Sequence, residues 1–180
     1  MSPTADDSCI ELLTPPTETD VNVLWVAYSR TPDNCLTHWN QHGNAQPADI
    51  SIINVGDSVR SAAAATGGTG GPGPIQTVAS AGDLTGLGIA ISNVLSQWAE
   101  TDAQTVVCFD SLTALLQYVE PEKAYEFLHV LTGRLFAADA IAHFHITSDA
   151  HDDQTVAMLR SLFDAEVSIT EDDERIVLTR

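Results

Sequence analysis

The sequence predicts an α/β fold in which a mainly parallel β-sheet is covered by helices on both faces. Two observations lead to this prediction. Apolar runs, clearest at residues 21–29, are continuous rather than alternating, which is typical of strands buried on both faces. The segments between several of these runs have apolar residues at helical spacing, as expected for the crossovers that join parallel strands. A chain of 180 residues is long enough for one domain with a sizeable core.

The predicted strands are rich in β-branched and aromatic residues. They span residues 21–29, 50–55, 105–109 and 141–147. Near the C-terminus, residues 167–169 and 176–178 alternate around the polar turn 171–174, which predicts a β-hairpin. The stretch 66–74 is rich in glycine and proline and predicts a flexible loop.

The predicted helices follow from their start signals and from apolar spacing. They lie at residues 6–14, from about 31 to 43, from about 83 to 99, from Pro121 onward, and around Val156, Leu159 and Leu162. A proline at a helix start, as at Pro32 and Pro121, loses no hydrogen bond because the first N–H groups of a helix have no partner within it. A strand, helix, strand alternation of this kind predicts right-handed crossovers and a parallel sheet.

The composition is strongly acidic, with 25 acidic residues against seven basic ones and a net charge of −18. Lys123 is the only lysine. This balance indicates adaptation to molar salt, where screening makes self-repulsion tolerable. Because the acids are spread along the chain, we favour this interpretation over an acidic mimic of nucleic acid. No basic cluster could grip phosphates, so direct nucleic-acid binding is not expected.

The sequence also predicts a cytoplasmic protein that does not enter membranes. It begins without a signal peptide and contains no apolar run long enough to span a bilayer. Cys9, Cys35 and Cys108 are far apart and lack metal-type spacing, which predicts buried thiols in a reducing compartment.

The most specific local pattern is Val106 to Thr113, in which four apolar residues precede Asp110 and Ser111. An Asp at the carboxyl end of a buried strand is the Walker B pattern, where the carboxylate reaches the magnesium ion of a bound nucleotide. Asp110 and Ser111 are therefore candidate cofactor-binding residues. The alternative is a polar turn in which Asp110 caps or hydrogen-bonds the sheet edge.

The region from Thr105 to about Asp164 resembles the KaiC-like branch of the RecA ATPase superfamily. It is most similar to a haloarchaeal family of unknown function, through Asp-Ser-Leu-Thr-Ala-Leu-Leu-Gln-Tyr-Val at residues 110–119 and His-Phe-His-x-x-x-Asp-Ala-His-Asp at residues 143–152. Val23 to Leu36 fits the strand and helix that follow the phosphate-loop helix. The resemblance implies a RecA-like sheet over most of the chain.

Two departures from the ATPase pattern predict a pseudo-ATPase. A Walker A loop needs a lysine at a helix start, and no lysine precedes Asp110. The glycines of residues 67–73 are followed by Pro74, Ile75 and Gln76 rather than by a basic residue. The resemblance also implies a catalytic acid just past the second strand, where this chain has Tyr28-Ser29-Arg30-Thr31.

The strand that carries the phosphate loop in the superfamily has no counterpart in this sequence. The missing strand would leave unpaired edges in the sheet, which are costly. We expect one of three solutions: the sheet closes differently, another chain fills the gap, or the true start lies upstream of Met1. We favour closure in which the C-terminal strands pair directly with residues 141–147.

His143, His145 and His151 form a candidate metal site. His143 and His145 share one face of a strand, and His151 could return from the following loop. The alternative is that these histidines bond to neighbouring backbone or acidic groups, because their spacing matches no established metal motif. Asp149 and Asp152 lie in the same segment.

Three functions remain open from the sequence. The leading hypothesis is a non-catalytic domain without a cofactor that acts through protein partners or self-association in regulation or signalling. The second is an ATP-binding module completed by a partner chain or a further N-terminal segment, with Asp110 as a ligand of Mg²⁺. The third, a metal-dependent enzyme, would use the histidines. No hydrolase motif of the G-x-S-x-G type is present.

Overall fold

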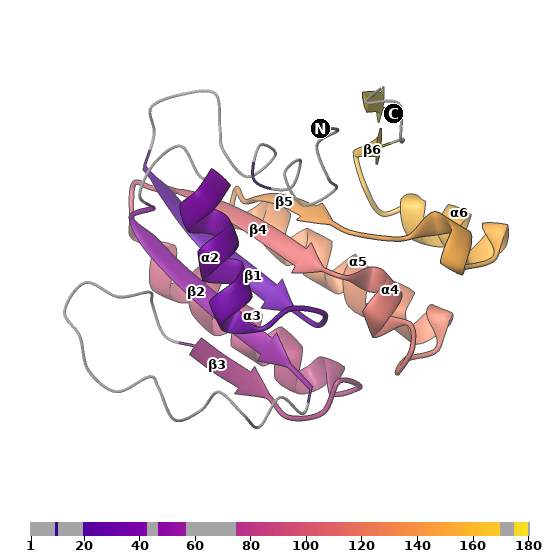
Figure 1. Ribbon diagram of the computed structural model, residues 1–180, viewed down its shortest axis with the longest axis horizontal. Coiled ribbons are helices and arrows are strands. Elements are labelled where there is room, and N and C mark those ends of the chain that lie inside the picture. The colour runs from indigo at the N-terminus through magenta and orange to yellow at the C-terminus, as the bar shows by residue number, and fades with distance from the viewer. Residues whose placement is uncertain (1–9, 11–19, 43–46, 57–74, 170–174, 180) are drawn as a thin grey trace.

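The computed structural model describes Ile10 and residues 20–42, 47–56, 75–169 and 175–179. Its main element is a sheet of five parallel strands in the order β3-β2-β1-β4-β5 (Figure 1). The strands are β1 (Val21–Ala27), β2 (Asp49–Val55), β3 (Ile75–Val78), β4 (Gln104–Asp110) and β5 (Ile141–Phe144). The predicted α/β class with a parallel sheet is confirmed.

Helices cover both faces of this sheet, as predicted. Helix α2 (Pro32–His42) lies on one face, and α3 (Leu84–Trp98) and α5 (Pro121–Ala137) lie on the other (Figure 1). Successive residues of β1 enter different cores: Val23 and Trp25 pack on the α2 side, and Leu24 and Val26 on the α3 side. This division follows from the two-residue period of a strand and explains the continuous apolar run.

The shorter helices follow β4 and β5. They are α4 (Leu112–Leu115), the 3₁₀ turn Ser148–Ala150 and α6 (Asp153–Arg160). Asp152 caps α6, since its carboxylate accepts hydrogen bonds from the backbone N–H and the hydroxyl of Thr155. These hydrogen bonds, the backbone one first, lower the pKa of Asp152. None of the described helices is long and apolar enough to cross a membrane.

The element predictions hold with few exceptions. The sequence patterns missed β3 and α4, each only four residues long, and the predicted strand 141–147 ends at Phe144. The predicted loop 66–74 and the turn 171–174 lie outside the described residues. So does the predicted helix 6–14 except for Ile10, which is buried in the α2-side core.

The predicted C-terminal hairpin is confirmed, but the favoured closure of the sheet is wrong. Strand β6 (Ala165–Ile169) pairs antiparallel with β7 (Arg175–Thr179) in a separate two-stranded sheet. Helix α6 carries the chain away from the main sheet before β6 begins (Figure 1). Among the described strands, β5 therefore pairs only with β4 and forms an edge.

Candidate functional site

The strand order places a candidate site between the carboxyl ends of β1 and β4. Strands β2 and β3 follow β1 in sequence and lie on one side of it in the sheet. Strands β4 and β5 lie on the other side, so the strand order reverses between β1 and β4. In open α/β sheets, ligands bind where the strand order reverses in this manner. A pocket of about 480 Å³ opens at this point. It is lined by Ser29, Arg30, Asn34, Thr37, His38, Gln41 and Asp110.

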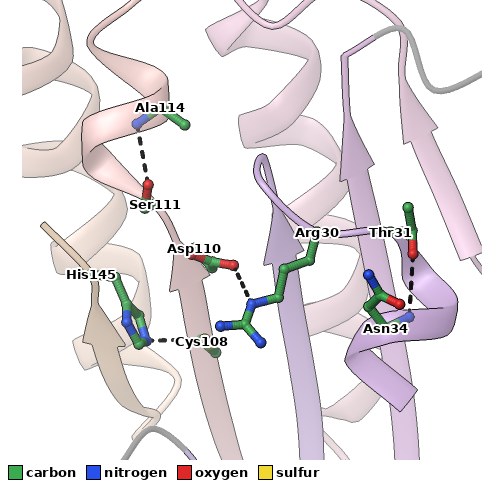
Figure 2. A network of polar contacts seen from close by, with 8 residues as sticks. All are labelled: Arg30, Thr31, Asn34, Cys108, Asp110, Ser111, Ala114 and His145. Carbon is green, nitrogen blue, oxygen red and sulfur yellow. Dashed lines mark hydrogen bonds and ion pairs between the residues drawn. The ribbon is translucent and has the colours of Figure 1, made fainter. Parts of the chain in front are cut away.

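An ion pair between Arg30 and Asp110 lies in this pocket (Figure 2). The parallel register sets Ala27 of β1 opposite Asp110, and the Tyr28 N–H donates to the Asp110 carbonyl oxygen at 2.7 Å. Just beyond, the Arg30 Nε donates to the Asp110 Oδ2 at 2.8 Å. The side chains are 20% and 11% exposed, respectively. The guanidinium thus neutralises the carboxylate that the Walker B pattern singled out.

Ser111, the other candidate cofactor-binding residue, caps a helix in the structure. Its peptide bond with Asp110 is cis. Its Oγ accepts a hydrogen bond from the Ala114 N–H at 3.2 Å, which makes it the N-cap of α4 (Figure 2). Ser, Thr, Asp and Asn are preferred at such positions because their oxygen satisfies an unpaired N–H group. Ser111 therefore has a structural role as the cap of α4.

Tyr28, the residue that follows β1, packs against the core on the α3 side of the sheet. Its hydroxyl donates to the Ala81 carbonyl oxygen at 3.2 Å, and its ring contacts Phe109 with centroids 5.6 Å apart. Burial, and secondarily the charge of Asp83, raises the pKa of Tyr28 well above its usual range. Tyr28 therefore remains neutral, and Arg30 is the cation that faces Asp110.

Sequence reasoning missed the contact of Arg30 with Asp110, although both positions were noted. Residues 28–31 were considered for a carboxylate that is absent, and Arg30 was given no partner. A usable signal was available. Carboxyl ends of parallel strands meet at one edge of a sheet, so charged residues just past two such ends are candidates for pairing.

The histidines predicted as metal ligands separate into two places. His143 and His145 lie together with ring centroids 5.0 Å apart. The Cys108 Sγ lies 3.5 Å from the His145 Nε2 (Figure 2). The His151 Nε2 instead lies 3.3 Å from the Thr113 Oγ1. The structure thus replaces His151 with Cys108 in the group of possible ligands.

Comparison with known families places the chain in one of them. A family model described as "Family of unknown function (DUF7504)" matches residues 1–169. The chain belongs to this family. No curated protein matches it.

In this DUF7504 chain, two polar groups are built on the same strand, β4. Asp110 ends the strand in the pocket, and Cys108, two residues earlier, faces the α2 side of the sheet. The first group is an ion pair whose two charges neutralise each other. The second is a set of thiol and imidazole groups suited to a borderline-soft metal ion.

Proposed function

We propose that the chain is a non-catalytic domain, related to the RecA and KaiC-like ATPases, that acts through protein–protein contacts in cytoplasmic regulation or signalling. The observation that carries this proposal is the Arg30–Asp110 ion pair. In an active ATPase the corresponding carboxylate helps to bind Mg²⁺. Here the Arg30 guanidinium pairs with the Asp110 carboxylate, which is largely buried.

The sequence adds two independent supports. No lysine precedes Asp110, so the described pocket and the rest of the chain before it lack the usual partner of the β- and γ-phosphates. The chain also has Ser29 and Arg30 where a catalytic acid would follow β1. An ATPase of this type needs the carboxylate that binds Mg²⁺, the lysine that contacts the phosphates and the catalytic acid. Binding of the nucleotide without stabilisation of the charge in the transition state does not speed phosphoryl transfer.

The edge that β5 forms among the described strands supports action through protein contact. The His145 N–H donates to the Phe109 carbonyl oxygen, and the His145 carbonyl oxygen accepts from the Leu112 N–H. The backbone polar groups of His145 therefore point toward β4 and the turn that follows it. By strand alternation the backbone groups of Ala142 and Phe144 face away from β4. Ile141 on this strand is 46% exposed. Such edges pair readily with a strand of another chain.

Salt adaptation and an archaeal origin belong to the same proposal. The net charge of −18 supports salt adaptation, because molar salt screens the repulsion among these charges. Neither nucleic acid nor membrane is proposed as a partner. A protein or a second copy of the chain fits the exposed strand better.

A second candidate function is favoured by the place of the pocket. It lies at the reversal of strand order, where nucleotides bind in many α/β proteins. In this alternative a partner or a further segment completes an ATP site, and Asp110 exchanges Arg30 for Mg²⁺.

Thermal unfolding of the full chain in molar KCl, with and without millimolar Mg-ATP, separates the two functions. We expect no shift and no phosphate release above the blank. A ligand present at 100 times its Kd would add about 2.7 kcal/mol, or roughly 5–10 °C for a chain of this size. A shift of that size in the natural chain that is absent in Asp110→Asn would contradict the proposal and support the ATP module.

A further inference from the structure

The group of Cys108, His143 and His145 is a consequence of strand register. Strands β4 and β5 are parallel, and Cys108 lies directly opposite His143. His145 is two residues further along and therefore lies on the same face as His143. Its N–H donates to the Phe109 carbonyl at 3.0 Å, which extends the pairing past the last residue of β5. Three possible ligands thus converge from two adjacent strands.

The distances suit a tetrahedral metal ion. One ligand atom from each residue lies within 4.8 Å of the other two. The Cys108 Sγ and His145 Nε2 are 3.5 Å apart. Zinc–sulfur and zinc–nitrogen bonds of about 2.3 and 2.05 Å at a tetrahedral angle separate sulfur from nitrogen by about 3.6 Å. Rotation of the His143 and His145 rings would bring all three atoms to one ion.

We propose that Cys108, His143 and His145 bind a zinc ion and leave one of its four coordination positions open. Thiolate and imidazole are ligands that zinc prefers, and the described group contains no carboxylate that would favour magnesium or calcium. On binding, the Cys108 thiol loses its proton to solvent as its sulfur bonds to zinc. The ion links the edge strand β5 to β4.

The surroundings suit such a site. Cys108 is fully buried in the α2-side core, whereas His143 and His145 are half-buried, so a metal could reach the group from the β5 side. A Zn²⁺ ion with one thiolate adds a net charge of +1, which is favourable in a chain with a net charge of −18. The open position could hold water or a group from a partner. This inference does not depend on the proposed function.

Metal titration of the full chain tests the inference. After removal of metals by a chelator, Zn²⁺ would be added in competition with a chromophoric chelator, and Co²⁺ in a parallel series. We expect one equivalent of zinc to bind. The cobalt form should show the visible bands of tetrahedral coordination and a thiolate-to-metal charge-transfer band in the near ultraviolet.

Single variants identify the ligands. Loss of a residue that only supports a metal ligand costs about 10–100-fold in affinity, so loss of a ligand should cost at least about 100-fold. We expect that loss for His143→Gln, His145→Gln and Cys108→Ala, and disappearance of the charge-transfer band in Cys108→Ala alone. Cys35→Ala, at another buried thiol of the same core, and His151→Gln are matched controls that should bind zinc normally.

The result that would overturn the inference is absence of zinc binding, or equal binding by the ligand variants and the controls. Cys108→Ala replaces a core residue, so circular dichroism must show that it folds. If it does not fold, His143→Gln and His145→Gln decide the question, because these side chains are half-buried and their loss leaves the core intact.

Discussion

The centre of the sheet and its β5 edge differ in burial and in strand pairing. All seven residues of β1 are buried, and β1 pairs with β2 on one side and β4 on the other. No residue of β5 is fully buried, and the described chain pairs it on one side only. We therefore expect the edge to open locally more readily than the centre, and such an edge can pair with a strand of another chain.

The polar groups follow the same division. At the centre, Asp110 meets Arg30 within the chain. At the edge, His143 and His145 gather beside Cys108 without a carboxylate among the described ligands. A buried charge at the centre is compensated within the chain, whereas the edge brings thiol and imidazole groups together.

Salt removal should have the largest effect, because it acts on the whole chain. Lowering the KCl concentration from about 3 M to about 0.1 M lengthens the Debye length to about 10 Å. The repulsion among the 18 excess negative charges is then less screened. We expect unfolding temperatures to fall, up to loss of the fold, measured by circular dichroism.

Hydrogen exchange sharpens this prediction. During dilution, amides of β5 should lose protection before those of β1, which is paired on both sides. Identical spectra and protection from high to low salt would contradict the proposed salt adaptation. Equal loss of protection in β1 and β5 would contradict the division between centre and edge.

Truncation of Phe109 should have the next largest effect. Phe109 is fully buried, and its ring stacks on Phe144 at 5.4 Å, so it joins the centre to the edge strand. Phe109→Ala should lower the free energy of unfolding by about 3–5 kcal/mol, measured by urea denaturation at constant KCl.

Phe136 provides the matched control for this truncation, because its side chain is 88% exposed. Phe136→Ala should change the free energy by no more than about 0.5 kcal/mol. Similar losses for both variants would show that Phe109 does not occupy the core.

Removal of the Asp110 charge should cost about 2–4 kcal/mol. Asp110→Asn leaves the largely buried Arg30 guanidinium without its ionic partner, and breaking a fully buried pair costs about 3–5 kcal/mol. Equilibrium unfolding of Arg30→Gln, Asp110→Asn and the double variant would measure the coupling.

The exposed pair of Arg160 and Glu166 is the comparison for this coupling. Its side chains are 52% and 26% exposed, so Arg160→Gln should cost at most about 1 kcal/mol. If the two pairs contribute equally, the carboxylate at the centre is less enclosed than the geometry indicates.

The smallest effect on stability is expected at the edge itself. Ile141 is 46% exposed, and Ile141→Lys should change the free energy of unfolding by about 0.5 kcal/mol or less. A lysine on an edge strand discourages strand pairing, so self-association measured by sedimentation should weaken. Val130→Lys, at a 54% exposed position on α5, is the control and should not change association. Loss of association in both variants, or in neither, would argue against β5 as the interface.

Most of the fold could be predicted because its signals are local. The continuous apolar runs of β1, β2 and β4, and the proline and glycine signals around the helices, depend on neighbours in sequence. Strand β3 was not predicted, because it has only four residues and only Val78 among them is buried. It therefore lacks an apolar run. Its place in the sheet depends on pairing with β2, which lies across a long connection.

The candidate sites show the same limit. Asp110 and the pair His143 and His145 could be found from strand-end position and from alternation. The contact of Arg30 could have been suspected only from the meeting of strand ends, and Cys108 had no local signal, because their partners lie 80 and 37 residues away, respectively. His151 was expected to return toward the other histidines, but the 3₁₀ turn at Ser148–Ala150 carries it to Thr113.

The sequence by itself determined the fold class, the buried strands, the terminal hairpin and the absence of a lysine before Asp110. These depend on residue type and short-range period. Only the tertiary structure decided that Arg30 neutralises Asp110, that Cys108 joins the histidines, and that the hairpin forms its own sheet and does not pair with β5. Strand order and register bring these groups together, and both are set by the packing of all elements at once, which no local pattern encodes.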